Sequence, residues 1–493
     1  MGSTAHQRIL TVPELLADRA FDEPERAALI VAGVGTLTFR EWDERSDAAA
    51  HGLIACGVGR GEKVGLVFGA RDWLDFAVTW TAVLKAGAVA VPISDRMAPV
   101  QRDEMLVRCG ATAVLYGQIV APPAGPGWAG TAAQLQTGTT GQPDVRVELT
   151  DPAQILFTSG TTGRPKGVRA THANLGARGP ISPKRRAFAH SKYLLHAFPI
   201  GTNAGQVMLT HALTAAPAVV TLPQFTPARF ARLIESYSAG TVFVVPAMAT
   251  ELLSAGIAAN HDLSSVLLLG SAASALPPKV AAGLVEAFPN ATITNYYTST
   301  EASPAQTIMI YDPQRPSALG RPAAGSELKV ADSNGVRLSP GETGEVWLRA
   351  GPYSRSYHGE EDSQDTVFRD GWVRMGDLGY VDEDGFLHLV DRDSDVIKSG
   401  AFKVPTLQVE AELYEHPDVT EAAVFGISHP VMGMAVAAAV VATSPISLAG
   451  VRSFLGERLA QHELPTRLLV LDRLPRNDAG KVIKQTLRRI AKE

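Results

Sequence analysis

The sequence predicts an α/β protein. We expect a large N-terminal domain of parallel α/β sheets with a β-barrel-like subdomain, followed by a small, mobile α+β C-terminal domain. Short apolar segments alternate with helical patterns between residues 63 and 296, as in parallel strands whose two faces are covered by helices. Hairpin patterns follow from about residue 327, and a shorter stretch of mixed helices and strands begins after about residue 393. We therefore expect domains at 1–392 and 393–493.

Each element of the first part has its own sequence cue. A helix is expected directly after Thr38, because Thr38 and Glu41 form a capping box that satisfies backbone donors at a helix start. A strand at 63–68, an apolar helix at 72–87 and a strand at 88–93 come next. The strand pattern then recurs along the chain, at 112–116, 193–197, 218–222, 241–245, 266–269 and 291–296.

The later part of the chain is richer in turns. ELKVADSNGVRL (327–338) is typical of a hairpin that turns at Ser-Asn-Gly, GETGEVWLRA (341–350) resembles another, and DEDG (382–385) marks a further turn. In the C-terminal unit we expect helices near 405–415 and 447–461, and strands near 421–427 and 435–442.

Composition limits the classes of function. The chain of 493 residues has a net charge of −5 and no basic block, which argues against a nucleic-acid binder. Its two cysteines, Cys56 and Cys109, belong to no CxxC motif, which fits a reducing compartment. The start, MGSTAHQRIL, lacks the apolar core of a signal peptide, and no apolar segment approaches the ~20 residues that span a bilayer. We therefore expect a cytoplasmic protein without a nucleic-acid or membrane partner.

Residues 155–167, ILFTSGTTGRPKG, combine an apolar strand with a loop of Thr, Ser and Gly. Such a loop can gather several backbone N–H groups in one concavity, where hydroxyls add donors and glycines permit close approach. These groups suit phosphate oxygens. The common NTPase pattern GxxxxGK[ST] is not met, since Pro165 stands five residues after Gly160 and Gly167 follows Lys166. The alternative interpretation is a flexible linker.

The segment NYYTSTEA (295–302) is a candidate metal site. Glu301 and Thr300 stand just past a predicted strand, and Mg²⁺ prefers one or two carboxylates together with substrate oxygens. Tyr297 offers a face on which a base could stack. The alternative is a turn at the end of a strand with a surface glutamate.

Two later segments carry charged candidates. In GDLGYVDEDGFLHLVDR (376–392), Asp377 could accept ribose hydroxyls and Arg392 supplies a fixed cation. A turn aspartate and an ordinary salt bridge would explain the same residues. In LPRNDAGKVIKQTLRR (474–489), Lys481 follows a glycine and precedes a basic helix, which is also typical of a solvated helix face.

Together, in this order, the four segments resemble the adenylate-forming superfamily, which includes acyl- and aryl-CoA synthetases, firefly luciferases and the adenylation domains of peptide synthetases. TSGTTGRPKG matches that family's phosphate loop almost residue for residue, and YYTSTE, GDLGYVDEDGFLHLVDR and PRNDAGK follow at the expected spacings. The match covers essentially the full chain. The resemblance implies an ATP-dependent acyl-CoA synthetase, which activates a non-amino carboxylic acid as acyl-AMP, releases pyrophosphate and transfers the acyl group to the thiol of coenzyme A.

The resemblance also implies how the nucleotide is held. The Thr/Ser/Gly loop and its lysine would wrap the phosphates, Asn295 would meet the adenine amino group, Tyr297 would stack on the ring, and Asp377 would bind the ribose hydroxyls. The full set implied for ATP and AMP is Thr158, Ser159, Gly160, Thr161, Thr162, Gly163, Lys166, Gly270, Ser271, Ala272, Asn295, Tyr296, Tyr297, Thr298, Asp377 and Arg392.

The catalytic set implied by the resemblance is Lys481, Thr300 and Glu301, with Thr300 at the α-phosphate and Glu301 as the Mg²⁺ ligand. In family members the small domain then rotates about a hinge two residues past the arginine, here Ser394. That rotation would bring a second face to the site, and a coenzyme A channel would be bordered by Ser399, Gly400 and Ala401. The implied cofactors are ATP, Mg²⁺ and coenzyme A.

The acid pocket is implied at Gly201, Thr202, Asn203 and Thr298. Thr298 replaces the family's usual glycine, and Thr202 stands where CoA ligases often carry a histidine or an aromatic residue, with small neighbours that predict a roomy pocket. Amino-acid-activating relatives place an aspartate here, and none stands between 196 and 206. We therefore expect a large or bulky acid, uncharged apart from its carboxylate.

Alternatives to an enzyme that transfers the acyl group to free coenzyme A are open at this point. A free-standing ligase could load its adenylate onto the phosphopantetheine of an acyl carrier protein, and a luciferase-like oxygenase belongs to the same family. The departures at Thr298 and at Ser394, where the hinge is usually Asp or Lys, would also fit a nucleotide-binding homologue that has lost catalysis. The oligomeric state is open between monomer and homodimer.

Overall fold

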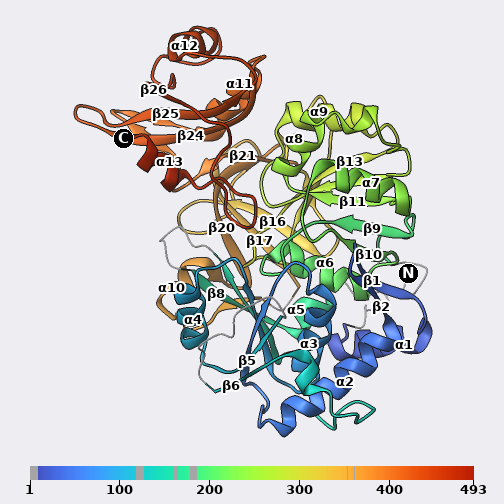
Figure 1. Cartoon of the computed structure of the whole chain (residues 1–493). Helices are drawn as coiled ribbons and strands as arrows, with labels where there is room; N and C mark the ends of the chain where they lie inside the picture. Colours follow the sequence, from blue (N-terminus) through green and yellow to red (C-terminus); the bar gives the residue numbers. More distant parts are fainter. Residues whose placement is uncertain are drawn as a thin grey trace, which may run out of the picture.

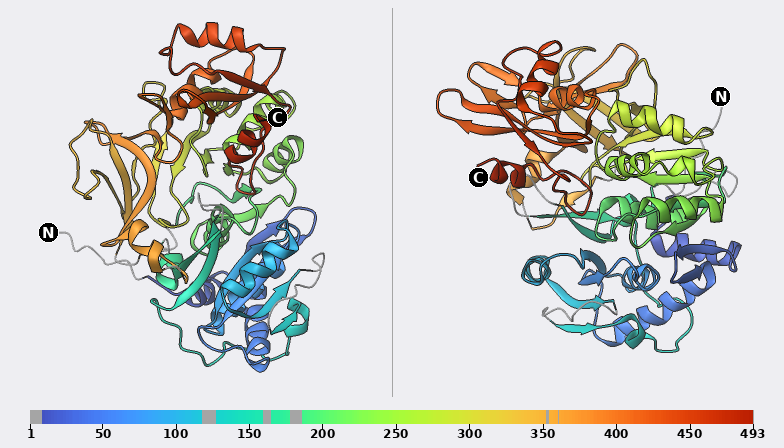
Figure 2. Two further views of the ribbon diagram at one scale, coloured as in Figure 1. Left: turned by 90° about the vertical axis from the view of Figure 1, so that its left-hand side faces the viewer. Right: turned by 45° about the horizontal axis from the view of Figure 1, so that its top comes forward.

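The computed structural model describes residues 9–117, 127–158, 165–177, 186–351, 354–359 and 361–492. Two large sheets with their helices make up most of the body, and the C-terminal unit, orange to red, lies at one end of it (Figure 1). Two further views show the same separation of the C-terminal unit from the blue N-terminal part (Figure 2).

The first sheet has nine strands among the described residues, in the order β15-β14-β13-β12-β11-β9-β10-β1-β2. Its centre from β13 to β1 is parallel, while β2, β14 and β15 pair antiparallel at the two edges. The bounds are β1 (Ala27–Val31), β2 (Gly35–Thr38), β9 (Tyr193–His196), β10 (Ala218–Thr221), β11 (Thr241–Val244), β12 (Leu268–Ser271), β13 (Thr292–Tyr297), β14 (Thr307–Ile310) and β15 (Arg321–Pro322).

Helices connect these strands and pack against the sheet, as the alternating pattern predicted. They are α6 (Asn203–Thr214), α7 (Pro227–Tyr237), α8 (Pro246–Ser254) and α9 (Pro278–Ala287). The parallel centre of the sheet is therefore confirmed, and the carboxyl ends of β12 and β13 come side by side, with Ser271 opposite Asn295.

The second sheet has seven described strands, in the order β18-β8-β7-β4-β3-β5-β6. The strands β4, β3, β5, β6 and β7 are parallel, whereas β8 returns antiparallel along β7 and β18 adds antiparallel to β8. The bounds are β3 (Lys63–Phe68), β4 (Val89–Ser94), β5 (Ala111–Tyr116), β6 (Trp128–Gly130), β7 (Pro152–Thr158), β8 (Lys166–Thr171) and β18 (Ser356–Tyr357). Short helices α4 (Pro99–Arg108) and α5 (His172–Gly176) follow β4 and β8.

Helix α3 (Trp73–Lys85) lies between the two sheets and contacts strands of both. All but two of its residues are buried, which explains why its sequence is apolar on every side. It packs against α2 (Phe39–Ala55), where the Trp42 indole N–H donates to the Ala77 carbonyl at 3.0 Å. Thr38 caps α2 through the reciprocal contacts with Glu41 that the sequence predicted.

A third, antiparallel sheet follows, in the order β16-β17-β20-β19 with β21 beside β20. Its elements are β16 (Ser326–Ala331), β17 (Gly344–Ala350), α10 (Glu361–Val367), β19 (Phe368–Arg369), β20 (Trp372–Val381) and β21 (Leu387–Arg392). The turn at 382–385 is confirmed between β20 and β21. The Ser-Asn-Gly turn also forms, but the described residues after it do not make a second hairpin strand. They make a single bridge, Ala331 to Arg337, because β16 pairs along its full length with β17.

The C-terminal unit has its own sheet, in the order β23-β22-β25-β24 with β26 beside β25. Its elements are β22 (Ile397–Ser399), β23 (Phe402–Val404), α11 (Thr406–Tyr414), β24 (Val419–His429), β25 (Gly433–Ala442), α12 (Leu448–Gly456), β26 (Arg467–Val470) and α13 (Lys484–Ile490). A separate apolar core, with Val409, Val424 and Val451 among its members, holds the unit together. We propose the boundary between residues 392 and 393 on this basis. No helix in the described part of the chain is both long and apolar enough to cross a membrane.

Candidate functional site

A buried carboxylate, Asp377 on β20, lies at the centre of the candidate site. The Tyr297 hydroxyl at the end of β13 donates to its Oδ2 at 2.5 Å, and Arg392 Nε lies 3.3 Å from its Oδ1. Asp377 and Arg392 are direct partners in the β20–β21 pairing, so the sheet sets their spacing. Burial and the neighbouring Asp377 raise the pKa of Tyr297, which keeps its hydroxyl a proton donor.

Lys481 reaches the same place from the C-terminal unit. Its pKa is lowered from the ordinary value by burial and by Arg392, whereas Asp377 and Glu301 act in the opposite direction. All three of these neighbours belong to the preceding part of the chain. The structure therefore brings the lysine amine close to two carboxylates and one guanidinium that lie far from it in sequence.

The loop that carries Lys481 is fixed by hydrogen bonds within it and by contacts with the larger body. Within it, the Lys481 N–H donates to Asn477 Oδ1 at 2.9 Å, and Gly480 has a φ of +80°. Towards the larger body, the Ser94 hydroxyl at the end of β4 donates to Asp478 Oδ2 at 2.9 Å. A Cβ on Gly480 would lie 3.1 Å from Val245 Cγ2, so the loop packs closely against the first sheet as well. The second sheet, the first sheet and the C-terminal unit thus meet at this loop.

Glu301 lies where the strands around the Thr/Ser/Gly loop end. Its Oε1 accepts from Tyr357 at 3.2 Å and from Thr158 at 3.5 Å. Lys166 Nζ stands 4.9 Å from the centre of the Tyr357 ring, on the far strand of the same loop. Ser159, Gly160, Thr161, Thr162 and Gly163 lie outside the described residues. One end of the loop, Thr158, therefore lies at Glu301, and the other end, Lys166, lies at Tyr357, which also bonds Glu301.

Two neighbours of Glu301 were missed by the sequence analysis. Tyr357 arrives on β18, which pairs with β8, and Arg355 donates from Nη1 to the Thr300 carbonyl at 2.9 Å. Neither residue stands in a motif. The pairing of β18 with β8 brings Tyr357 to the site, and the short segment around the two residues carries no sequence pattern that would predict it.

Unpartnered polar atoms mark the ends of β12 and β13. Ser271 Oγ and Asn295 Oδ1 are buried without a hydrogen-bond partner among the described residues. A buried polar atom left unpaired costs ~1–3 kcal/mol, so such atoms call for a partner. The carboxyl ends of parallel strands are where α/β sheets bind ligands. Gly270, just before Ser271, must stay small because a Cβ there would lie 2.5 Å from the Phe243 ring. The same Cβ would lie 3.0 Å from the Tyr296 ring, and Ala272 follows at the strand end.

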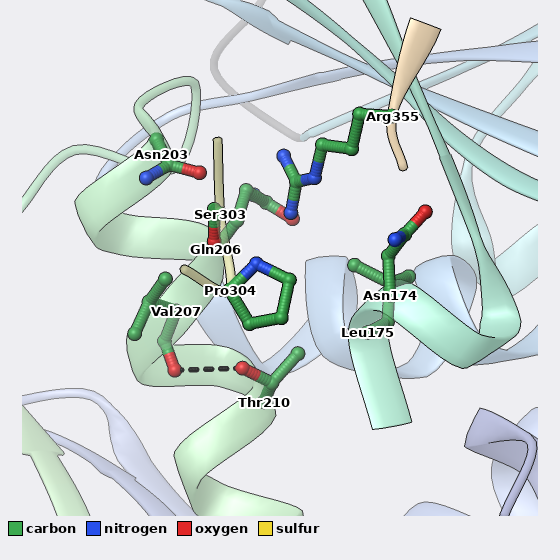
Figure 3. A pocket seen from close by; sticks show the side chains of 9 residues that line it. All are labelled: Asn174, Leu175, Asn203, Gln206, Val207, Thr210, Ser303, Pro304 and Arg355. Atoms are coloured by element: carbon green, nitrogen blue, oxygen red, sulfur yellow. Dashed lines mark hydrogen bonds between the residues drawn. The ribbon is translucent and has the colours of Figure 1, made fainter. Parts of the chain in front are cut away.

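The expected acid-pocket residues have mixed environments. Thr202 caps α6, since its hydroxyl donates to the Pro199 carbonyl at 2.8 Å and accepts from the Gly205 N–H at 3.1 Å. A Cβ on Gly201 would lie 3.1 Å from the Ser94 nitrogen, so this glycine permits close backbone packing. The Thr298 hydroxyl donates to the Ala305 carbonyl at 2.6 Å. Of the four, Asn203 lines the pocket beside α6 and the loop after Glu301 (Figure 3).

The predicted hinge, Ser394, is exposed in the turn between β21 and β22. Next to it the buried Asp391 accepts from the Thr406 N–H and hydroxyl, and Lys484 donates to the same hydroxyl at 3.0 Å. Of the predicted channel residues, Ser399 is buried and Gly400 and Ala401 are exposed in the β22–β23 turn. In that turn the Gly400 N–H donates to the Met432 carbonyl, which also belongs to the C-terminal unit.

Comparison with known proteins identifies relatives. The family model described as AMP-binding enzyme matches residues 16–358, and the one described as AMP-binding enzyme C-terminal domain matches residues 408–481. Feruloyl-CoA synthase from an Amycolatopsis species is 29% identical over 495 residues, which covers 96% of this chain and 97% of that protein. The 4-coumarate--CoA ligase-like 9 of Arabidopsis thaliana is 32% identical over 356 residues, or 70% of this chain and 63%, less than two thirds, of that protein.

The fold is also similar to solved structures. The o-succinylbenzoate CoA synthetase of Bacillus subtilis, in complex with its acyl-adenylate intermediate, superimposes with a TM-score of 0.83 at 26% identity, covering 97% of this chain and 99% of that one. The same enzyme with ATP and a magnesium ion gives a TM-score of 0.81 at 25% identity, over 97% and 99% of the two chains. Since the first family model alone spans residues 16–358 of the 493, the chain belongs to the AMP-binding enzyme family, the adenylate-forming enzymes that its four motifs predicted.

Proposed function

We propose that the protein is an ATP-dependent acyl-CoA synthetase. It activates a non-amino carboxylic acid as acyl-AMP, releases pyrophosphate and passes the acyl group to coenzyme A. The observation that carries the proposal is the position of the loop with Lys481, which bonds Ser94 through Asp478 and packs on Val245 through Gly480, so that the amine lies near Glu301, Asp377 and Arg392. The names of the relatives, CoA ligases and CoA synthetases, support coenzyme A as the acceptor.

The residues present fit a bound nucleotide. Asn295 Oδ1 is an acceptor without a partner, as the amino group of adenine requires, and Ser271 Oγ lies on the adjacent strand end. Asp377 is the residue assigned to the ribose hydroxyls, and Arg392 beside it supplies a cation. The Thr/Ser/Gly loop between Thr158 and Lys166 is assigned to the phosphates.

Glu301 is the residue assigned to Mg²⁺. Thr158 and Tyr357 orient its carboxylate through their hydroxyls. Among the described residues, no group of three or more His, Cys, Asp or Glu side chains could hold a metal ion. A site with one protein carboxylate plus substrate phosphates is the arrangement that Mg²⁺ prefers, and the bound ion neutralises phosphate charge.

Charge explains why a lysine is needed at this position. When a carboxylate attacks the α-phosphate, two anions come together and pyrophosphate leaves, so cations must offset the growing negative charge. Positioning and electrostatics dominate such transfers, and the attacking carboxylate is already ionised, so no general base is required. Lys481 is assigned to bridge the carboxylate and the α-phosphate, with Thr300 as a second contact to that phosphate.

Thioester formation needs a different face of the C-terminal unit. We assign Ser394 as the hinge, and Ser399, Gly400 and Ala401 as the border of the coenzyme A channel after rotation. The alternative acceptor is the phosphopantetheine of a carrier protein. A thioesterification assay that supplies either free coenzyme A or a carrier protein with a free phosphopantetheine thiol distinguishes the two, and efficient reaction with free coenzyme A is the expected result.

Replacing the lysine should separate the two half-reactions. Lys481→Ala should lower acid-dependent ATP–pyrophosphate exchange by on the order of 10²-fold or more, because one preorganised charge contact contributes ~3–4 kcal/mol at a transition state. Thioester formation from a supplied acyl-adenylate should change much less. Lys492→Ala, an exposed lysine on the last turn, is the control and should change neither. Equal losses in both half-reactions would refute the assigned role.

The lowered pKa of Lys481 predicts a pH dependence. The charged amine is the working form, so kcat/KM for ATP in the exchange reaction should fall as pH rises through a pKa below the ordinary lysine value of 10.5. In the Lys481→Arg variant the guanidinium keeps its charge over the same pH range, so the fall of kcat/KM at alkaline pH should shift to higher pH. An alkaline limb that stays in place in the arginine variant would mean that another group titrates.

The unpartnered hydroxyl of Ser271 predicts an effect on binding without an effect on folding. Ser271→Ala removes a buried hydroxyl that has no partner in the free protein, so the melting temperature should stay unchanged or rise slightly. KM for ATP should increase about 5–10-fold, as expected for the loss of one hydrogen bond of ~1–1.5 kcal/mol. A variant that melts lower and binds ATP normally would show that Ser271 has a structural partner instead.

A further inference from the structure

Arg476 stands at the start of the loop that carries Lys481, outside the set of residues assigned to ATP, the acid or coenzyme A. It pairs with Val482 in an antiparallel bridge, so these two residues close the loop from either side. Inside the loop the Asn477 N–H donates to the Lys481 carbonyl at 2.9 Å, and the Gly480 N–H donates to the Asn477 carbonyl at 2.9 Å. The direction of the Lys481 side chain therefore depends on how this short turn is held.

Two nitrogens of the Arg476 guanidinium hold the turn to the sheet of the C-terminal unit. Nη1 donates to the Gly480 carbonyl at 2.8 Å, and Nη2 donates to the Glu421 carboxylate on β24. The planar guanidinium presents its N–H groups in a fixed geometry, so one side chain sets the spacing between the turn and the strand. The Arg476 side chain is 24% exposed and that of Glu421 is 16% exposed, so water screens the pair only in part. Because Gly480 directly precedes Lys481, Arg476 holds the peptide from which the lysine side chain projects.

A second carboxylate comes from the larger body. Gly480 packs close to Val245, the residue that precedes α8, and Glu251 lies on that helix. Burial raises the pKa of Glu251, Glu421 raises it further and Arg476 lowers it, as expected where two carboxylates lie near one guanidinium. Arg476 is thus surrounded by charges from both sides of the contact between the larger body and the C-terminal unit.

We propose that Arg476 is a positioning residue for adenylation. It directs Lys481 by holding the Gly480 carbonyl in place. Its positive charge also offsets the two carboxylates that come together where the C-terminal unit docks, Glu421 and Glu251. The inference rests on the proposed function, since it concerns the half-reaction assigned to the docked lysine. Thioester formation is assigned to a different face of the C-terminal unit, so it should not depend on this guanidinium.

The first test replaces the guanidinium with an uncharged side chain of similar length. It uses ATP–pyrophosphate exchange with the best acid from a panel of benzoic, phenylpropanoic and medium-chain fatty acids. Arg476→Met should lower kcat by about tenfold or more, because a small misplacement of a catalytic group is costly. KM for ATP should stay within about twofold, and thioester formation from a supplied acyl-adenylate within about threefold, since the residues assigned to those steps are unchanged.

Arg458→Met is the matched control. Arg458 also belongs to the C-terminal unit, donates to the Phe454 carbonyl at 3.1 Å and lies 3.7 Å from the Glu412 carboxylate. Neither partner belongs to the loop with Lys481, so both half-reactions should be unchanged. The melting temperature of each variant shows whether it is folded under the assay conditions.

A double variant tests the contribution of charge. In Arg476→Met, Glu421 and Glu251 lie near each other without the cation, so adding Glu251→Gln should restore exchange by about threefold. Glu251→Gln alone should change exchange by less than about twofold, because Arg476 still balances Glu421. A loss that came from packing alone would not be recovered by removing a charge from α8.

Several results would overturn the inference. They are unchanged exchange in folded Arg476→Met, equal losses in both half-reactions, a loss confined to KM for ATP, or a double variant no more active than Arg476→Met. If Arg476→Met does not fold, Arg476→Lys replaces it. This variant keeps the charge but has one nitrogen where the guanidinium uses two, so kcat should fall by about threefold or more, and an unchanged kcat would overturn the inference. Absence of exchange by the unchanged protein with every acid would instead refute the proposed function, which keeps the two failures apart.

Discussion

The arrangement depends on one buried carboxylate. Asp377 binds Arg392 on the neighbouring strand, accepts from Tyr297 and attracts Lys481 from the C-terminal unit. Without it, the Arg392 guanidinium, which lowers the pKa of Lys481, would face that amine with less opposing charge nearby. Asp377 thus connects the first sheet, the third sheet and the loop that carries Lys481 (the lysine loop). The docked position of the C-terminal unit is further supported by the Ser94–Asp478 bond and by Lys279, which donates to the Tyr414 and His416 carbonyls.

Much of this could be predicted from the sequence because local physics determines it. The capping box at Thr38, the apolar strands of the two large sheets and the turn at 382–385 all depend on neighbours along the chain, and the structure has each of them. The motif residues Asp377, Arg392, Glu301 and Lys481 also come together as the family resemblance implied. Their roles in catalysis stay predictions.

Other features depend on contacts between distant segments, which no local pattern reveals. The antiparallel return of β8 and the addition of β18 bring Tyr357 to Glu301, although neither residue belongs to a shared motif. Small residues near 201 suggested a roomy acid pocket, yet Gly201 is small because the backbone at Ser94 passes close by.

The central claim is that the lysine loop, docked as it is here, performs adenylation and must leave before the thioester forms. A reversible cross-link tests it most directly. Ser94→Cys and Asp478→Cys, combined with Cys56→Ser to remove the exposed native thiol, would tie the loop to β4 on oxidation. The account predicts that the oxidised protein keeps acid-dependent exchange within about threefold, loses thioester formation by about 10²-fold or more, and regains it on reduction. Unimpaired thioester formation in the fully cross-linked protein would contradict it.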